Sequence, residues 1–511
     1  MSDHGTGAQA SNGVRLRSFL SEAVFVGAED ITVHSCCDRA DRCRPGDVFV
    51  PRHAADRDEH EQVAEAVQRG AVAVIAERLL PVDVPQCLVP NNARVYAQLC
   101  QQLAGNPTRR MLTVGIVGTH GKTTTALFVA AMLKRLGGAV AYRTSLGTSD
   151  SRECDRLATK CPGPQRLAGW LAAAERAGAP AAVIELSDAM LRRHVAAGID
   201  FDVVIVTSMR PGQRTGGRAT RTSGNLVRQL VQECSTEPLV LYNADDACAS
   251  LWAARNRFPA ATYGLDAAEH VRGKRLGHAG GEQQLLVAAG RVLMPLTLKL
   301  PGDHIARSAL AAVATAWLFD FSIPDAIAGV ETLTKIPGRM QRLAPAVEFP
   351  IHIDAAVTPD QLAVVLHALR RHQMGRTTVV HDLQPRLHPQ WRHRLGEVFQ
   401  ANECRVVLTG AELSPQHLQS MAMDVLGGVK APGRVQIIPD REAAIRWAVA
   451  NTSSGNVLLS GRGIASWVTR DGELCTDEEV ALAAVQQMQP CPIPPTLNVF
   501  PSADSDSIFS H

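Results

Sequence analysis

The residues with the clearest chemical potential lie in a glycine-rich run that starts at Gly115. It reads Gly115-Ile116-Val117-Gly118-Thr119-His120-Gly121-Lys122-Thr123-Thr124, the spacing G-x-x-G-x-x-G-K-T, with Ile116 where the standard phosphate loop has its first glycine. Backbone N–H groups of such a loop wrap phosphates. Lys122 would neutralise the outer phosphates, and the Thr123 hydroxyl would coordinate Mg²⁺. The run therefore predicts a nucleotide-binding site.

The elements around this loop are expected to form a parallel, doubly wound sheet. Buried strands rich in Val and Ile are expected at residues 112–117, 181–186, 202–207 and 238–242. Helices are expected at 124–136 and 165–177, with a later strand at 297–301 and an alanine-rich helix at 306–319. Because strands and helices alternate, the loop follows a strand and opens a helix, as a phosphate loop must.

Two further α/β regions flank this sheet. Short apolar runs and a polar helical stretch at 59–68 indicate a small N-terminal α/β domain. Towards the C-terminus, strands are expected at 351–354, 377–381, 405–409, 435–438 and 456–460, which predicts a second parallel, Rossmann-like sheet. The expected domains are 14–106, 107–336 and 337–489, followed by a disordered tail rich in Pro and Ser at 490–511.

The composition narrows the class of protein. The 511 residues carry 52 Lys and Arg against 50 Asp and Glu, a net charge of +2, which argues against a nucleic-acid or membrane-surface partner. No apolar stretch approaches a membrane span, and the N-terminus lacks an apolar signal-peptide core. The 12 cysteines include no C-x-x-C pair, and Cys36, Cys37 and Cys43 lack histidines at ligand spacing, so free thiols are expected. We expect a soluble cytoplasmic monomer.

The loop resembles the ATP-binding loop of the Mur ligases, which add amino acids to peptidoglycan precursors, and of their folylpolyglutamate synthetase relatives. The resemblance extends over nearly the whole chain. Residues 44–50, 58–60 and 69–71 resemble the uridine-nucleotide-binding domain of that family. Within the family, the chain is most similar to the ligases that add the third residue, diaminopimelate or lysine.

The resemblance assigns roles to particular residues. Glu185, at the end of an expected strand, is implied as a metal ligand with Thr123 and as a catalytic residue with Lys122; the alternative for Glu185 is a solvated charge at a strand end. The implied ATP contacts are Gly118, Thr119, His120, Gly121, Lys122, Thr123, Thr124, Asn243, His304, Arg339 and Asp354.

The resemblance also implies a three-domain enzyme that uses ATP and Mg²⁺. Its family phosphorylates a substrate carboxylate to an acyl phosphate, which the amine of an amino acid then attacks. The implied partners are a nucleotide-linked muramyl peptide and an amino acid. Charge neutralisation on the γ-phosphate and alignment of carboxylate with amine are the physical requirements of this reaction.

The chain departs from the family pattern mainly at positions that the family uses to bind metal, ATP and substrate. Ala189 stands where the family has a metal-binding histidine, and the family's carbamylated lysine falls near Val227. No lysine occurs between Lys160 and Lys274, so a shift of alignment cannot supply one. The other replacements lie at residues 212–215, 303–304, 355, 357, 410–413 and 461–465.

Two functions fit this pattern. In the first, the chain is a working ATP-dependent amide ligase with altered metal and substrate sites, where Arg210, Arg214 and Arg228 offer positive charge in place of a second Mg²⁺. In the second, it is a non-catalytic paralogue that binds ATP or a uridine-nucleotide precursor and acts as a scaffold or regulator. A plain P-loop kinase or transporter ATPase is disfavoured, because the flanking regions resemble the ligases.

Overall fold

A computed structural model describes most of the chain. The described residues are 13–51, 53–54, 57–155, 161–209, 214–215, 218–219, 223–279, 282–343, 349–372, 375–385 and 387–487. The tail predicted at 490–511 and Arg210 lie outside these ranges, as do the side chains of Arg214, Glu59 and His60. Within the described ranges, no helix combines the length and apolarity that crossing a bilayer requires.

Contacts divide the chain into two compact units. The first runs as far as Lys274 and adds Leu286–Pro295 and Arg307–Thr332. The second comprises Arg275–Leu285, Leu296–Ala306 and the chain from Leu333 onward. The predicted boundary between residues 106 and 107 falls inside the first unit, and the domain limits expected from the sequence stay predictions.

The N-terminal region is a small α/β fold around a five-stranded sheet in the order β2-β9-β8-β5-β4. Strands β4, β5, β8 and β9 run parallel, and β2 joins β9 antiparallel. Its elements are β1 (Val14–Arg15), α1 (Leu16–Phe19), β2 (Val24–Val26), β3 (Thr32–Val33), β4 (Cys36–Cys37), η1 (Ala40–Arg42), β5 (Val48–Phe49), β6 (His53–Ala54), β7 (Arg57–Asp58), η2 (Glu59–Gln62), α2 (Val63–Gln68), β8 (Ala73–Ala76), β9 (Gln86–Leu88) and α3 (Asn92–Leu103).

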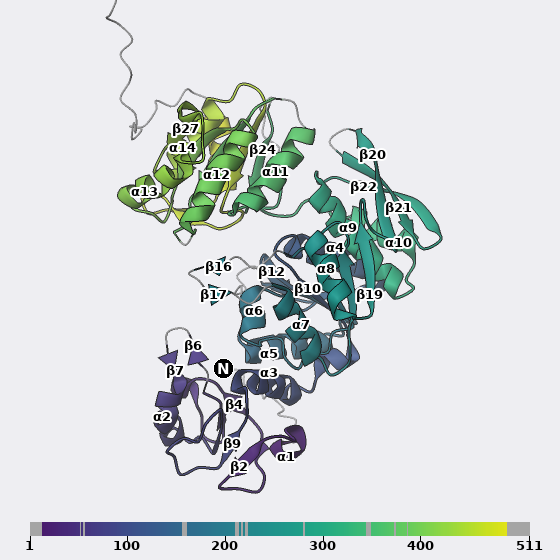
Figure 1. Ribbon diagram of the computed structural model, residues 1–511, viewed down its shortest axis with the longest axis vertical. Helices are drawn as coiled ribbons and strands as arrows, with labels where there is room; N and C mark the ends of the chain where they lie inside the picture. Colours follow the sequence, from purple (N-terminus) through teal and green to yellow (C-terminus); the bar gives the residue numbers. More distant parts are fainter. Residues whose placement is uncertain are drawn as a thin grey trace, which may run out of the picture. The chain divides into compact units, whose positions relative to one another are not determined.

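The central sheet has eleven strands in the order β13-β12-β11-β14-β10-β15-β18-β19-β20-β21-β22. Figure 1 labels β12, β10 and β19 to β22 of this sheet. The strands from β11 to β20 in this order are parallel, which confirms the doubly wound sheet expected from the sequence. The elements up to the middle of the sheet are η3 (Pro107–Arg110), β10 (Leu112–Val117), α4 (Lys122–Gly137), β11 (Ala141–Thr144), β12 (Gly147–Ser149), β13 (Cys154–Asp155), α5 (Pro164–Arg176), β14 (Ala181–Glu185), α6 (Asp188–Arg192) and β15 (Val203–Val206). The remaining elements are β16 (Arg214–Thr215), β17 (Arg218–Ala219), α7 (Ser223–Glu233), β18 (Leu239–Asn243), α8 (Ala247–Asn256), β19 (Ala260–Gly264), β20 (Val271–Ala279), β21 (Glu282–Ala289), β22 (Val292–Leu298), α9 (Asp303–Leu318) and α10 (Ile323–Glu331).

Helices α5, α6 and α7 cover apolar side chains on one face of this sheet. Val117, Ile184 and Val206 project into one core with residues of α5, α6 and α7. Helix α4 contacts β10, β11 and β14, and α10 packs on α4. This packing fixes the carboxyl end of β10, and with it the glycine-rich loop.

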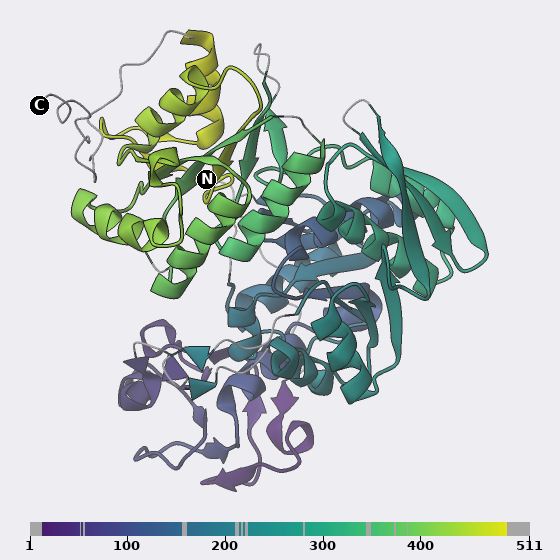
Figure 2. The ribbon, with the colours of Figure 1, turned by 45° about the horizontal axis from the view of Figure 1, so that its top comes forward.

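The C-terminal region holds a six-stranded sheet in the order β23-β24-β28-β25-β26-β27, seen from two directions in Figures 1 and 2. All pairs except β23 with β24 are parallel, as the sequence predicted. Strand β28, last of the five parallel strands in the sequence, lies between β24 and β25, so these two successive strands are not neighbours in the sheet. Its elements are β23 (Gln341–Leu343), β24 (Ile351–Asp354), α11 (Pro359–His372), β25 (Thr377–Asp382), α12 (Pro389–Ala401), β26 (Arg405–Thr409), α13 (Pro415–Leu426), η4 (Pro432–Arg434), β27 (Val435–Ile437), α14 (Arg441–Ala450), β28 (Asn456–Ser460), β29 (Trp467–Val468), β30 (Leu474–Cys475) and α15 (Asp477–Gln487).

Candidate active site

The glycine-rich loop joins β10 to α4 in a conformation that only glycine adopts readily. Gly118 has φ +135°, and a Cβ atom there would lie 2.3 Å from Thr207 Oγ1. Gly121, at φ +78°, is the N-cap residue of α4. The first N–H groups of a helix have no intrahelical acceptor and carry the positive end of the helix dipole. The loop is therefore built to receive an anion at the start of α4.

Two residues after β15 hold this loop in place. Ser208 O accepts a 3.1 Å hydrogen bond from Thr119 N, and Ser208 Oγ accepts a 2.9 Å bond from His120 N. Thr207 Oγ1 donates to Val117 O at 3.1 Å. Neither Thr207 nor Ser208 was expected at the loop from the sequence. Because β15 pairs with β10, hydroxyl residues at its carboxyl end were the available signal.

Lys122 turns back across the loop. Its Nζ donates a 2.8 Å hydrogen bond to Gly118 O. This carbonyl is neutral, so the bond positions the ammonium group at the loop without cancelling its charge. The arrangement suits the predicted role of Lys122, neutralisation of a bound phosphate.

Three oxygen-bearing groups converge beside Lys122. Thr123 Oγ1 donates to Glu185 Oε2 at 2.9 Å and lies 3.0 Å from Ser145 Oγ. Ser145 N donates to the same Glu185 oxygen at 2.8 Å. Hydroxyl and carboxylate oxygens are the ligands that Mg²⁺ prefers, so this donor set fits the ion that the loop implies. Ser145, just beyond β11, is a third member of the group that was not expected from the sequence.

Asn243 supports the loop from the next strand. Its Nδ2 donates to Thr207 O at 3.1 Å, and its Oδ1 accepts from Asp245 N at 3.1 Å. Burial would raise the pKa of Asp245, but hydrogen bonds from Leu265 N and from the Arg307 guanidinium, among others, hold it at about 2. Asp245 is therefore an anion that anchors Arg307, through a 2.6 Å contact to Arg307 Nε.

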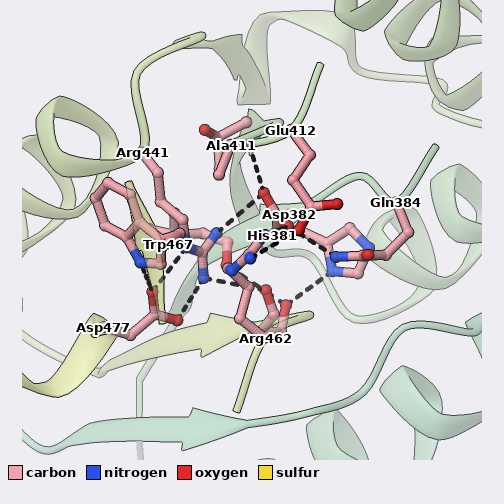
Figure 3. A network of polar contacts seen from close by, with 12 residues as sticks. His381, Asp382, Gln384, Ala411, Glu412, Arg441, Arg462, Trp467 and Asp477 are labelled. Carbon is pink, nitrogen blue, oxygen red and sulfur yellow. Dashed lines mark hydrogen bonds and ion pairs between the residues drawn. The ribbon is translucent and has the colours of Figure 1, made fainter. Parts of the chain in front are cut away.

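A second polar cluster lies at the carboxyl ends of the C-terminal strands (Figure 3). Arg462 donates from Nη1 to Asp382 Oδ2 and from Nη2 to Glu412 Oε1, both at 2.9 Å. Only 5% of the Arg462 side chain is exposed, whereas 58% of Glu412 is. Ala411 N donates to Asp382 Oδ1 at 3.0 Å. The arginine is thus held between two carboxylates at the carboxyl ends of the strands, which is where doubly wound sheets bind ligands.

Behind this cluster, Arg441 forms a fully buried pair with Asp477. Arg441 Nε donates to Asp477 Oδ1 at 2.7 Å, and Nη2 donates to Asp477 Oδ2 at 2.5 Å. Trp467 Nε1 also donates to Asp477 Oδ1, at 3.1 Å (Figure 3). Nearby, burial and the Arg441 charge lower the pKa of His381 to about 3, so this imidazole is neutral.

Known families match the greater part of the chain. Residues 116–316 match the Mur ligase middle domain, and residues 338–463 match the Mur ligase, glutamate ligase domain. The chain belongs to the Mur ligase family. The family resemblance inferred from the phosphate loop, and the three-domain α/β architecture, are thereby confirmed.

Individual Mur ligases resemble the chain over most of its length. The UDP-N-acetylmuramoyl-L-alanyl-D-glutamate–2,6-diaminopimelate ligase of Geobacillus kaustophilus is 27% identical over 460 residues, which cover 87% of this chain and 93% of the relative. The ligase of the same name from Chromobacterium violaceum is 29% identical over 434 residues, covering 83% and 87%.

Solved structures of Mur ligases share the fold. A structure of a ligase of that name superposes with a TM-score of 0.67 at 19% identity, covering 93% of this chain and 99% of the other. The MurF ligase of Thermotoga maritima in complex with ADP superposes with a TM-score of 0.57 at 18% identity, covering 89% and 96%.

The predicted ATP contacts outside the loop of this Mur ligase have separate local roles. His304 lies in the first turn of α9. Asp354 ends β24 and accepts 2.8 Å hydrogen bonds from Met340 N and Ala356 N. Burial raises the pKa of Asp354, against the opposing charge of Arg339. His304, Arg339 and Asp354 belong to the second unit and the loop to the first, so their contact with ATP stays a prediction.

Two described residues that the resemblance places at the family's second metal site carry no metal-binding atom. Ala189, in α6, offers no ligand atom. Val227, in α7, is 1% exposed and packs in the apolar core with Leu226 and Leu230. Of the arginines predicted to compensate, Arg228 is exposed on α7, while Arg210 and the Arg214 side chain lie outside the described residues.

Proposed function

We propose that this Mur ligase binds ATP with Mg²⁺ at residues 118–124 and forms an amide bond on a UDP-N-acetylmuramoyl-peptide substrate. ATP phosphorylates a substrate carboxylate to an acyl phosphate and leaves as ADP. The amine of an amino acid then attacks the acyl carbon, and phosphate departs. The convergence of Lys122, Thr123 and Glu185 at the glycine-rich loop is the observation that carries the proposal.

Each loop residue has a distinct part in this reaction. The N–H groups at the start of α4 and the Lys122 ammonium bind the phosphate that is transferred. Thr123 Oγ1 and Glu185 Oε2, 2.9 Å apart, would hold Mg²⁺. When bound, Mg²⁺ neutralises charge on the phosphate oxygens. Gly118 lets the loop lie against Thr207 and Ser208, where an added Cβ would not fit.

The proposal extends to the finer predictions from the sequence. Asn243, His304, Arg339 and Asp354 contribute to the ATP site, with Asn243 acting through the Thr207 segment that it supports. The protein acts as a monomer in the cytoplasm, where ATP is supplied. The domain limits 14–106, 107–336 and 337–489 belong to the same proposal.

A second function, a scaffold or regulator without turnover, is favoured by the residues at two positions where the family's metal and amino acid would bind. Val227, near which the resemblance places the family's carbamylated lysine, has no ligand atom and lies in the apolar core. The guanidinium of Arg462 is paired with Asp382 and Glu412. It is therefore engaged at the strand ends where an incoming amino acid would bind. In this alternative, the loop still binds ATP or a uridine-nucleotide precursor.

Phosphate release distinguishes the two functions. The purified full chain is incubated with ATP, Mg²⁺ and the muramyl-dipeptide nucleotide, together with a panel of amino acids. The Lys122→Ala variant is compared with Lys134→Ala, whose lysine is exposed later on the same helix.

The proposed ligase requires phosphate release that depends on both the nucleotide substrate and an amino acid. Lys122→Ala should lower this rate at least about a hundredfold, because a preorganised cationic donor contributes that much to phosphoryl transfer. Lys134→Ala should leave it unchanged. ATP binding without turnover across the panel would favour the scaffold instead.

A further inference from the structure

Three potential metal ligands meet in the N-terminal region, far from the phosphate loop in the sequence. Cys37 ends β4, Cys43 follows η1, and Asp47 immediately precedes β5. Their two Sγ atoms and a carboxylate oxygen all lie within 4.8 Å of one another. Each residue is only 7% exposed. Within the part of the chain that the structure describes, this is the one cluster of three such side chains at metal-binding separation.

Backbone hydrogen bonds hold the cluster in place without any ligand. Cys37 O accepts from Val50 N at 2.8 Å, and Cys43 N donates to Ala40 O at 3.1 Å. Asp47 N donates to Arg44 O at 3.0 Å, which closes the turn before β5. A site whose ligand-bearing backbone is fixed in advance loses little conformational entropy when an ion binds.

Neighbouring groups also orient the Asp47 carboxylate. Ser35 Oγ donates to Oδ1, and Arg44 N donates to Oδ2 at 2.8 Å. Such hydrogen bonds to a carboxylate fix its direction and leave lone pairs for a metal. Cys43 Sγ lies 3.9 Å from Arg44 O, which places a backbone carbonyl at the rim of the cluster.

We propose that Cys37, Cys43 and Asp47 bind one thiophilic divalent cation, with Zn²⁺ the best match. Two sulfur ligands and one carboxylate form a donor set typical of Zn²⁺. In a tetrahedral site, Zn–S bonds of about 2.3 Å and Zn–O bonds of about 2.1 Å separate the ligand atoms by roughly 3.4–3.8 Å. The observed limit of 4.8 Å admits this geometry with small side-chain rotations. A water molecule or the Arg44 carbonyl completes the set.

The ion would have a structural effect on this region. Binding joins the end of β4, the turn after η1 and the start of β5, three segments that are otherwise held by hydrogen bonds and by the shared apolar core of Cys37, Cys43 and Phe49. Residues 44–50, the segment that resembles the family's uridine-nucleotide-binding domain, lie between and beside these ligands. The two thiols lose their protons to solvent as the metal–sulfur bonds form, so affinity rises with pH.

Cobalt titration of the full chain tests the site directly. Metal-free, reduced protein is titrated with Co²⁺ under anaerobic conditions, and the thiolate-to-cobalt charge-transfer absorption is recorded. We expect one equivalent of Co²⁺ to develop this absorption together with the visible bands of a four-coordinate ion, and Zn²⁺ to abolish both. Because the charge-transfer absorption requires sulfur ligands, Co²⁺ at the phosphate loop does not contribute to it.

Variants assign the absorption to these residues. Cys37→Ser and Cys43→Ser should each lower the Co²⁺ affinity at least about tenfold and weaken the charge-transfer absorption, a loss of about 1.4 kcal/mol. Cys100→Ser removes another buried thiol of the same region and should change neither quantity. Where a variant fails to fold, protection of Cys37 and Cys43 from alkylation by Zn²⁺ in the unmodified chain replaces it as the readout.

Three results would overturn the proposal. The first is charge-transfer absorption that survives in the Cys37→Ser/Cys43→Ser double variant. The second is the lack of any sulfur-bound Co²⁺ in the unmodified chain. The third is a Cys37–Cys43 disulfide that forms under mild peroxide, while Zn²⁺ gives the reduced chain no protection from alkylation.

Discussion

Thr123 Oγ1 donates a 2.9 Å hydrogen bond to Glu185 Oε2, and this contact joins the first turn of α4 to the end of β14. The two residues are 62 positions apart in the chain. They meet because β14 pairs with β10, whose carboxyl end leads into the loop. The pair places a hydroxyl and a carboxylate where the resemblance implies a metal ion, and it can be tested apart from catalysis.

The Thr123 hydroxyl should determine how strongly Mg²⁺ promotes ATP binding. Thr123→Val keeps the shape of the side chain and removes the ligand oxygen, whereas Thr123→Ser keeps that oxygen. We expect Thr123→Val to lose about tenfold or more of the Mg²⁺-dependent gain in ATP affinity, and Thr123→Ser to retain it. Calorimetric titration of ATP with and without Mg²⁺ measures the difference. Equal Mg²⁺ dependence in the two variants would exclude Thr123 as a ligand.

Two glycine-to-alanine substitutions should separate ATP binding from stability. At Gly118, φ is +135° and the new Cβ would meet Thr207 Oγ1 at 2.3 Å, so Gly118→Ala should displace the loop and weaken ATP binding at least about tenfold. Gly169, inside α5, has no atom within 4 Å of an added Cβ. Gly169→Ala should raise the free energy of unfolding by about 0.5–1 kcal/mol, with ATP affinity unchanged. Normal ATP binding by Gly118→Ala would contradict the observed loop geometry.

The buried pair of Arg441 and Asp477 should dominate the electrostatic stability of the C-terminal region. Both side chains are 0% exposed, so Asp477→Asn removes the bidentate partner and leaves the buried guanidinium with only the more distant Asp382 carboxylate, 3.8 Å from Nη1. We expect a loss of about 3–5 kcal/mol in the free energy of unfolding, measured by urea denaturation. The partly exposed pair of Glu442 with Arg446 provides the control, since Glu442→Gln should cost less than about 1 kcal/mol. Similar losses of stability in the two variants would contradict the larger contribution expected of the buried Arg441–Asp477 pair.

His381 should make the protein sensitive to acid. Its pKa is about 3 in the folded chain, against 6.5 for an exposed imidazole, because burial and Arg441 oppose protonation. Only the unfolded chain gains a proton as the pH falls below 6.5, so stability is full above that pH and decreases toward pH 3. Between pH 6.5 and 5 the loss from this residue is about 2 kcal/mol.

The pH dependence of unfolding in His381→Asn tests this assignment. Asn retains a group that can bond Ser460 Oγ, the partner of His381 Nδ1 at 2.8 Å. The loss of stability between pH 6.5 and 5 should shrink by about 2 kcal/mol in this variant, whatever its stability at neutral pH. Replacing the exposed His417 by Asn should leave the pH dependence as it was. An unchanged pH profile in His381→Asn would show that this imidazole titrates normally.

Strong local signals determined much of the fold and part of the site. Strands β10, β24, β26 and β28 have the bounds expected from their apolar runs, because each is a continuous buried segment between polar turns. The expected late strand at 297–301 was less accurate: β22 is Val292–Leu298, and it alternates buried and exposed residues rather than forming one apolar run. Glycines and a lysine at fixed spacing likewise identified the phosphate loop, because this motif lies in one short run of the chain.

The sequence by itself therefore determined the family, the order of elements and the residues of the phosphate loop. The tertiary structure decided which distant residues meet: Ser145 and Glu185 with Thr123, Glu412 with Arg462, and Cys37 with Cys43 and Asp47. Each of these contacts depends on which strands are neighbours in a sheet, or on how a turn folds back. Strand order follows from burial summed over the whole chain, and local composition carries no record of it.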